Sequence, residues 1–320
     1  MIKVTHIRQA TTDEWKSAWD FCSYSCFSHS PAWVDLWSSY YQGKINADCQ
    51  LITFNDDKTG VFILTKKSFG KGLINVHESS VQHGYGGIIS SDSLEKSHFR
   101  AAEKYLITKY PTLFWRINPF SPTDLTERQH SSLEDFTYAV DLTLPSGDIE
   151  SQFTKKKIAT KARAGKRKGL RLSPLQEDDI NHYLAIYNDA ITRWQSDGKS
   201  VHRYSDDLFF EMFSIKECDF WGVWLDDDLV CAGPLLKSKT HVVSWLALAK
   251  TEALPLKPYE FFYYHLIHHY KKEGLQWFDF NPSGGNSGVD KFKERFATNI
   301  LPCPVIQKRS LLYRGLTLFK

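Results

Sequence analysis

The sequence lacks long apolar runs. No stretch approaches the roughly 18 to 20 apolar residues that a membrane-spanning helix needs, and the first 15 residues contain no apolar core of a secretory signal. A strong excess of one charge is also missing, because 40 Lys and Arg residues stand against 37 Asp and Glu residues. These absences favour a cytoplasmic protein, and they leave its partners to be judged from the distribution of charge.

The cysteines lack the spacing of a disulfide scaffold or a zinc site. Six occur along the chain, and Cys22 with Cys26 has no second pair to complete a metal site. His265 and His269 have the i, i+4 spacing of a zinc pair, but no acid follows in the pattern of a metallohydrolase. We therefore expect reduced thiols that mostly fill the core, and no metal.

Hydrophobic spacing predicts two successive series of helices and strands, with no short-period repeat or low-complexity tract. The first series comprises helices over residues 11–42, with a new start at Pro31, and 94–109, and strands over residues 50–54, 61–64 and 113–117. The second comprises helices over residues 150–168, 177–193, 205–216 and 259–273, and strands over residues 170–172, 220–225, 229–236, 241–248 and 277–280. Length and repetition predict an α+β protein with a duplicated mixed-sheet domain, divided into residues 1–145 and 146–320.

The run from Lys155 to Arg171 has the least balanced charge. Nine of its seventeen residues are Lys or Arg, no acid lies between Glu150 and Glu177, and its apolar content is low for a core helix. Such a run either disperses its charge in solvent or meets phosphate, as in a tRNA acceptor arm, a nucleotide sugar or an anionic lipid surface. It contains no aromatic residue, so contact with a phosphate backbone is indicated rather than base stacking. The positions that we assign to phosphate are Lys161, Arg163, Lys166 and Arg167.

A glycine-rich loop, residues 281–288, follows the strand expected over residues 277–280 and precedes a helix expected over residues 289–296. Small residues let the backbone approach a ligand closely, and the N-terminus of the helix offers free N–H groups to an anion. The loop matches no Walker or dinucleotide fingerprint, and a plain connection is the alternative.

Residues 277–297, WFDFNPSGGNSGVDKFKERFA, resemble the closing motif of the FemABX-like transferases, a branch of the GNAT acyltransferases. In that family a strand ending in Asp-Phe-Gly leads through a glycine- and serine-rich loop to Phe-Lys-x-x-Phe. Residues 82–88 resemble the family's tyrosine-and-glycine loop, residues 115–119 its strand ending in Arg-x-Asp-Pro, and the basic helix ending at Leu170 the start of its second half.

The resemblance implies two GNAT-like domains in tandem, with the active cleft in the second domain and the acceptor held between the two. It implies acyl or aminoacyl transfer to an amine, with Phe292 and Lys293 beside the transferred group. The implied substrate contacts are Trp33, Tyr85 and Asn118, together with either Arg203 and Tyr204 or Arg193 and Trp194.

Three departures from the family pattern argue against a muropeptide acceptor or a full family architecture. Asn118 stands where the peptidoglycan-modifying members usually carry Asp, and Asp35-Leu36-Trp37 stands where they carry a basic residue. The long helical arm that some members insert in the second half is missing as well.

Acyl transfer to an amine needs a proton acceptor and a positive group near the developing oxyanion. Lys293 fits the second requirement, unless it is simply a surface lysine beside Lys291 and Arg295. Asp279 is the candidate proton acceptor, although an Asp at a strand end more often caps the following loop.

The donor is either aminoacyl-tRNA, which would use the basic helix, or acyl-CoA, whose usual Arg/Gln-x-x-Gly-x-Gly/Ala turn is missing from the sequence. We expect no tightly bound cofactor. The expected acceptor is an amine on a small molecule or on a lipid-linked or nucleotide-linked precursor of the cell envelope. The alternative, from a different class, is a non-catalytic module that binds a phosphate backbone or an anionic surface on a degenerate fold.

Overall fold

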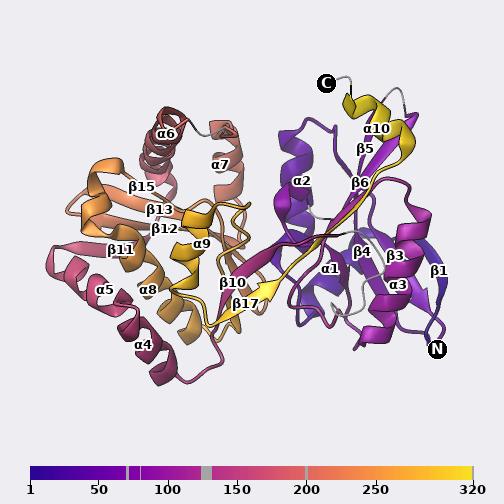
Figure 1. Cartoon of the computed structure of the whole chain (residues 1–320), viewed down its shortest axis with the longest axis horizontal. Helices are drawn as coiled ribbons and strands as arrows, with labels where there is room; N and C mark the ends of the chain where they lie inside the picture. The colour runs from indigo at the N-terminus through magenta and orange to yellow at the C-terminus, as the bar shows by residue number, and fades with distance from the viewer. Residues whose placement is uncertain (70–71, 80, 124–131, 199–200, 319–320) are drawn as a thin grey trace. The chain divides into compact units, whose positions relative to one another are not determined.

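The computed structural model describes residues 1–69, 72–79, 81–123, 132–198 and 201–318 (Figure 1). The chain forms two compact units. Unit 1 comprises Met1–Phe136 and Leu301–Lys320, and unit 2 comprises Thr137–Ile300. The expected division near residue 145 thus lies close to the first crossing, but the end of the chain returns to unit 1. It returns because β18 (Val305–Lys308) pairs with β8 (Leu113–Arg116), and a pairing so distant in sequence leaves no local pattern.

Unit 1 contains two sheets, with strand orders β1-β3-β4-β7 and β2-β5-β6-β8-β18-β9. The remaining strands are β1 (Val4–Gln9), β2 (Asn46–Ala47), β3 (Gln50–Phe54), β4 (Thr59–Ile63), β5 (Thr65–Phe69), β6 (Ile74–Glu78), β7 (Gly87–Ile89) and β9 (Ser132–Leu133). The helices are α1 (Thr12–Phe21), α2 (Pro31–Tyr40), α3 (Lys96–Lys109) and α10 (Leu311–Leu318). The expected helices and the β3–β4 hairpin are confirmed, whereas β1, β5 and β6 were not expected.

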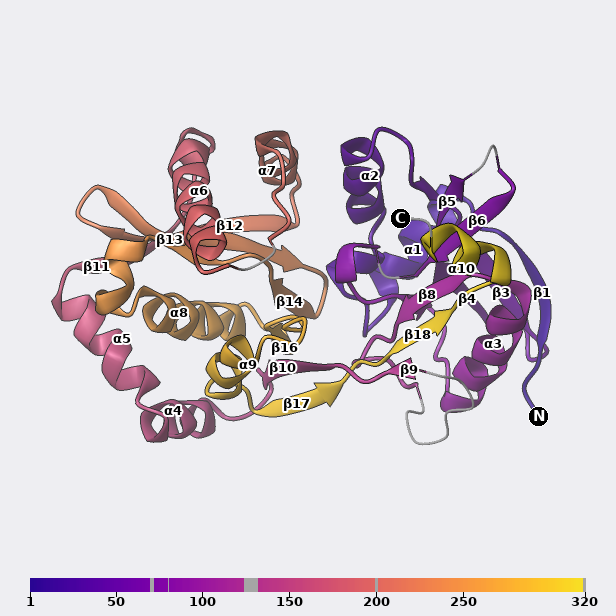
Figure 2. The same ribbon diagram turned by 45° about the horizontal axis from the view of Figure 1, so that its top comes forward.

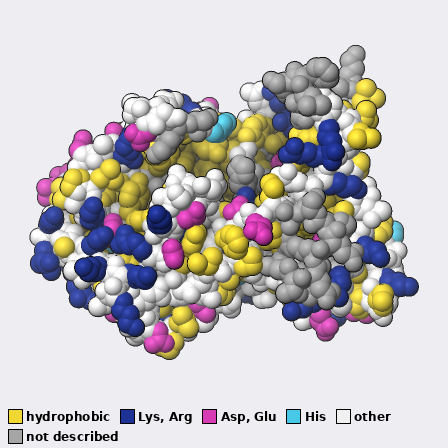
Figure 3. Space-filling view, in the orientation of Figure 1, with side chains coloured by type: hydrophobic (Ala, Val, Ile, Leu, Met, Phe, Trp, Pro, Cys, Tyr) yellow, Lys and Arg dark blue, Asp and Glu magenta, His cyan; other side chains and the backbone are white. Residues whose placement is uncertain are grey.

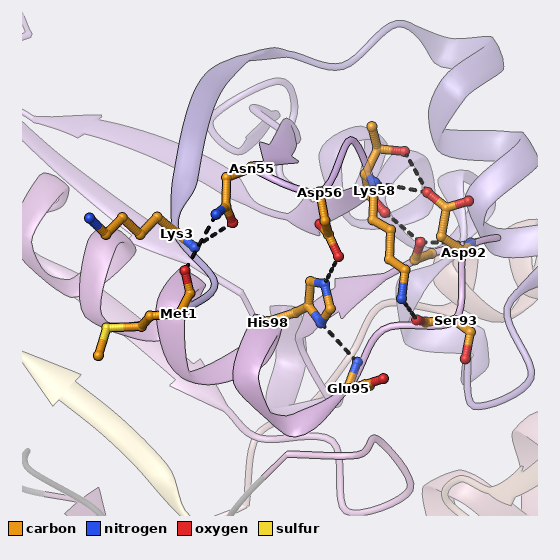
Figure 4. Close-up of polar contacts among 11 residues, drawn as sticks. Met1, Lys3, Asn55, Asp56, Lys58, Asp92, Ser93, Glu95 and His98 are labelled. Carbon is orange, nitrogen blue, oxygen red and sulfur yellow. Dashed lines mark hydrogen bonds and ion pairs between the residues drawn. The ribbon is translucent and has the colours of Figure 1, made fainter.

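Local chemistry explains where these elements begin and turn. α2 begins at Pro31 after Ser30, whose Oγ accepts from the N–H of Trp33 at 3.1 Å, so one unpaired donor of the first turn is satisfied. The β3–β4 turn is tied to its surroundings (Figure 4). Asn55 Oδ1 accepts from Lys3 N at 2.9 Å, and Asp56 Oδ2 lies 3.0 Å from His98 Nε2 on α3.

Unit 2 is built on one mixed sheet with the order β11-β12-β13-β14-β16-β10-β17 and with β15 paired to β13. Its strands are β10 (Phe136–Asp141), β11 (Leu170–Pro174), β12 (Cys218–Leu225), β13 (Asp228–Lys237), β14 (His241–Ser244), β15 (Leu248–Ala249), β16 (Trp277–Asp279) and β17 (Asn299–Pro302). Its helices are α4 (Ser146–Lys155), α5 (Ile158–Arg167), α6 (Ile180–Ser196), α7 (Asp206–Phe213), α8 (Pro258–Lys272) and α9 (Ser287–Glu294). α6 and α7 lie on one side of the sheet and α8 on the other (Figure 2). The predicted α+β class is confirmed.

α8 supplies much of the core of unit 2, as its stripe of apolar residues predicts. Phe262, Leu266, Ile267 and Tyr270 are fully buried. α5 packs closely against α8, because a Cβ added at Gly165 would lie 3.1 Å from a ring carbon of Phe261.

The basic run differs from expectation in two respects. The single helix expected over residues 150–168 is divided into α4 and α5 by Lys157, whose φ of 60° is left-handed. The view that it carries too few apolar residues for a core helix is wrong, because Ile158, Ala159, Ala162 and Gly165 on α5 are buried. Alanine and glycine suffice there, since small residues let two helices approach closely.

All six cysteines are free thiols with buried side chains, which confirms the prediction from their spacing. Within the described ranges, no helix has both the length and the apolar character that crossing a membrane requires.

Candidate active site

The neighbouring strands β14 and β16 of the unit 2 sheet separate from each other at one point. β14 and β16 run parallel as far as the pair Val243 and Asp279. Beyond it, the chain after β14 turns through Leu246, whose φ of 51° is left-handed, and β15 pairs with β13. On the other side, the N–H of Phe280 donates to Tyr138 O at 2.9 Å. The hydrogen-bond ladder therefore ends between Ser244 and Phe280, and the loop with the sequence motif starts at this opening.

Asp279 holds the start of that loop. Its carboxylate is fully buried, and Oδ1 accepts from Thr137 Oγ1 at 2.5 Å and from the N–H of Asn281 at 2.9 Å. Asn281 has a left-handed φ of 62°, a conformation that asparagine tolerates better than most residues. These contacts favour the capping alternative for Asp279 over proton transfer.

Lys293 reaches back to the same loop. Its Nζ donates to the carbonyl oxygen of Asn281 at 2.6 Å. The side chain is half-buried, whereas Lys291 on the same helix is exposed. The ammonium is therefore directed toward the strand opening, and Asp279, Asn281 and Lys293 form one chain of hydrogen bonds.

α9, which carries Phe292 and Lys293, begins two residues earlier than expected. Asn286 Oδ1 caps it by accepting from the N–H groups of Gly288 at 3.1 Å and Val289 at 3.3 Å. The expected loop over residues 281–288 thus ends at Asn286, and the first N–H groups of the helix are engaged by this cap.

Aromatic side chains of α8 pack against Phe292. Its ring centroid lies 5.9 Å from that of Tyr259, 6.0 Å from that of Tyr263 and 5.3 Å from that of Phe296. Burial raises the pKa of both tyrosine phenols, so each keeps its proton and can donate a hydrogen bond. Tyr263 Oη lies 3.1 Å from the Oγ of Ser244, at the end of β14. The opening is thus lined by neutral hydroxyls and aromatic rings near one ammonium group.

Glu260, on the first turn of α8, was not singled out from the sequence. Its side chain is buried, and Oε1 lies 2.8 Å from Lys161 Nζ and 3.4 Å from Arg295 NH1. In the sequence, Glu260 is a single acid inside a helix rich in aromatic residues. That pattern does not predict which residues pair with it.

The four positions assigned to phosphate fall into two groups. Lys161 pairs with Glu260, and Arg163 NH2 pairs with Glu150 Oε1 at 2.8 Å. Lys166 and Arg167 are exposed at the end of α5, and no carboxylate among the described residues forms an ion pair with them. Figure 3 shows Lys and Arg side chains gathered over the part of unit 2 that α4 and α5 occupy.

The residues of the two alternatives for an acceptor contact in unit 2 have different surroundings. Arg193 NH1 donates to Thr251 Oγ1 at 2.7 Å and to Ala249 O at 3.3 Å. The Tyr204 ring lies 5.6 Å from that of Trp245, which follows β14 directly. A partner for Arg203 is Asn188 Oδ1, at 2.6 Å from NH2. Tyr204 is therefore the member of this set that the structure brings to the end of β14, and among the described residues no hydrogen bond or ring contact places Trp194 there.

The three positions assigned in unit 1 have buried side chains. Trp33 Nε1 donates to Val81 O at 3.3 Å, and Asn118 Nδ2 donates to Tyr24 O at 2.8 Å. Tyr85 is 2% exposed, with its ring 6.1 Å from that of Phe120. These contacts stabilise the interior of unit 1. A substrate would therefore reach the three side chains only if the residues around them moved apart. Their binding role stays a prediction.

Comparison with known proteins shows what the part of the chain with the strand opening is similar to. Residues 152–294 match the family model described as an acetyltransferase (GNAT) domain. Among solved structures, that of FemX aligns with a TM-score of 0.68 at 10% identity, covering 98% of this chain and 99% of that one. The structure of L-PGS from Bacillus licheniformis aligns with a TM-score of 0.52 at 12% identity, covering 89% and 93%. No curated protein matches the chain in sequence.

A third similar structure is the C-terminal domain of a putative lysylphosphatidylglycerol synthetase from Agrobacterium fabrum. It aligns with a TM-score of 0.53 at 11% identity and covers 85% of this chain and 87% of that one. At such identities the likeness concerns the fold, and it extends over nearly the whole chain. The expected fold of two tandem GNAT-like domains is confirmed.

Proposed function

The chain carries a GNAT acyltransferase domain on a fold that it shares with FemX, and from this premise we propose a reaction. An acyl or aminoacyl group is transferred from an activated donor to the amine of a cell-envelope precursor, an amino sugar or a small metabolite. The observation that carries the proposal is the Lys293 ammonium, bound 2.6 Å from Asn281 O on the loop that leaves the strand opening.

The chemistry needs a positive group where negative charge develops. The amine nitrogen bonds to the carbonyl carbon, the carbonyl oxygen becomes an oxyanion, and the bond to the leaving oxygen or sulfur then breaks. Lys293 Nζ donates to Asn281 O, and this bond holds the ammonium at the start of the loop. Its positive charge can stabilise an oxyanion that forms beside it. The proton that the amine loses passes to the leaving group or to water, since Asp279 is held as a cap.

The segment that joins β15 to α8 helps to distinguish between the two possible donors. Residues 250–257 contain no glycine, and both the N–H and the hydroxyl of Thr251 donate to Asp189 Oδ2, at 2.9 and 2.8 Å. Glu260 adds an acid to the first turn of α8, where an anionic ligand would otherwise find a favourable helix end. These features disfavour a pyrophosphate at this helix and support aminoacyl-tRNA over acyl-CoA.

Side chains beside the same opening indicate the chemistry of the acceptor. The Tyr204 and Trp245 rings offer apolar faces beside it, and Arg203 supplies a nearby positive charge. A lipid-linked or nucleotide-linked amine fits these apolar faces and this positive charge, whereas Asn118, where the peptidoglycan-modifying members usually carry Asp, argues against a muropeptide.

Donor choice can be tested on the purified protein. Charged tRNA and acyl-CoA are compared for the rise in thermal midpoint that each gives at the same concentration. We expect protection, followed by acyl transfer to an amine, with charged tRNA. Protection by acyl-CoA alone would reverse the assignment of the donor. If neither donor supported acyl transfer, the proposed reaction would be refuted.

The phosphate surface is tested by salt dependence. The double variant Lys166→Gln/Arg167→Gln should reduce the slope of log affinity for tRNA against log salt by roughly one unit per lost contact. A matched control removes two exposed charges from α3 in unit 1, Lys96 and Lys104, and should leave the slope unchanged. Steep binding without any transfer would favour the non-catalytic phosphate-binding module.

A further inference from the structure

α9 is lightly anchored for a helix that presents the transfer residues. None of its side chains is buried between Ser287 and Glu294. Its contacts include the Phe292 ring against α8, the Lys293 bond to Asn281, and Arg295 at its C-terminal end. Because no side chain of the helix is buried, contacts of this kind fix its position.

Arg295 joins two of these contacts. Its guanidinium carbon lies 5.9 Å from the centroid of the Phe292 ring, within the range of a cation–π contact. Its NH1 lies 3.4 Å from Glu260 Oε1 on α8. The position of Arg295 therefore depends on a carboxylate outside α9, and Phe292 packs against the side chain that the carboxylate holds.

The same carboxylate oxygen also binds α5. Lys161 Nζ donates to Glu260 Oε1 at 2.8 Å, so one buried acid meets a cation from the basic helix and a cation from the motif helix. In Figures 1 and 2, α8 lies next to both α5 and α9. The Glu260 side chain is only 7% exposed, whereas those of Lys161 and Arg295 are 34% and 30% exposed. A buried carboxylate requires positive partners, because it is shielded from water. The two cations are partly exposed, so water can solvate them even without the carboxylate.

We propose that Glu260 is a positioning residue that holds α9, and with it Phe292 and Lys293, in place through Arg295. The inference rests on the proposed function, because it assigns the positioned side chains to the transfer reaction. Glu260 does not touch the reacting atoms. It fixes the helix that presents them, and displacement of a catalytic group by about 1 Å can lower a rate by about 100-fold.

The test combines a structural and a kinetic readout on the full chain. Glu260→Gln keeps the shape of the side chain and removes its charge, and Glu252→Gln is the control, because Glu252 is an exposed acid in the segment just before α8. Hydrogen exchange of residues 287–294 should become about tenfold faster in Glu260→Gln, and kcat should fall about tenfold or more with little change in KM. Neither quantity should change in Glu252→Gln.

A second variant separates positioning from simple destabilisation. Arg295→Gln removes a half-buried side chain and should accelerate exchange in α9 as Glu260→Gln does. The double variant should then accelerate exchange by less than the two single variants combined, because both changes remove the Glu260–Arg295 interaction. Fully additive effects, or unchanged exchange in α9 with either variant, would overturn the inference.

The outcomes also distinguish this inference from the proposed function. Faster exchange in α9 with no transfer by the wild-type chain would leave Glu260 as the anchor of α9 and refute the reaction. Normal transfer by the wild-type chain, together with unchanged exchange and an unchanged kcat in Glu260→Gln, would support the reaction and refute the positioning role of Glu260.

Discussion

Removal of the Lys293 side chain should separate its catalytic contribution from its structural one. In the proposed reaction, Lys293→Ala removes the positive charge near the oxyanion, and loss of one such donor costs about 3 to 4 kcal/mol in the transition state, or roughly 100- to 1000-fold in rate. The structural cost is smaller. The variant loses the hydrogen bond from a half-buried ammonium to Asn281 O, and such a bond contributes about 1 kcal/mol to stability. For a chain of this size, that lowers the thermal midpoint by about 4 °C at most.

The measurement is single-turnover transfer with saturating donor, alongside a thermal scan. Lys291→Ala is the matched control, because Lys291 is exposed on the same helix and its loss removes an equal charge. We expect Lys291→Ala to transfer within threefold of the wild type. Equal rates for the two variants would place Lys293 outside the reaction, and a large fall in the midpoint of Lys293→Ala would assign it a structural role instead.

Three further predictions concern stability. Gly165→Ala should lower the free energy of unfolding by about 1 to 3 kcal/mol, because the added Cβ would lie 2.9 Å from Leu170 Cδ1. Gly147→Ala in α4 should raise it by about 0.5 to 1 kcal/mol, because no atom lies within 4 Å of the added carbon; denaturant titration compares the two. Burial lowers the pKa of His29 to about 4, so unfolding should become easier as the pH falls from about 6.5 toward 4, by about 3 kcal/mol in total. His29→Gln should lose that share of the pH dependence, and an unchanged dependence would contradict the burial of a neutral imidazole.

Elements with strong local patterns could be predicted from the sequence. The stripe of α8 and the β3–β4 hairpin follow from spacing and turn residues within a few positions. β1 could not be predicted in this way, because its side chains do not alternate between buried and exposed. The break between α4 and α5 was also missed, since Lys157 is an ordinary helix former that takes a left-handed conformation here.

The candidate site was predicted only in part for a similar reason. The roles of Phe292 and Lys293 beside the transferred group, which the motif implies, stay predictions. Asp279 was the candidate proton acceptor with capping as the alternative, and its hydrogen bond from Asn281 N favours the cap. The partners of Glu260 come from positions 99 and 35 residues away, and no spacing rule connects them. The helical pattern of α8 places Tyr263 on its apolar face, and it does not reveal that the hydroxyl lies 3.1 Å from Ser244 Oγ at the end of β14.

The return of the chain to unit 1 has a consequence for synthesis on the ribosome. In the second sheet of unit 1, β18 lies between β8 and β9, so this sheet stays incomplete until residues 305–308 have emerged. By then every strand of the unit 2 sheet has been made. A nascent chain therefore exposes the unpaired edge of β8 for most of its elongation, and unit 2 can complete its folding before the unit that began first.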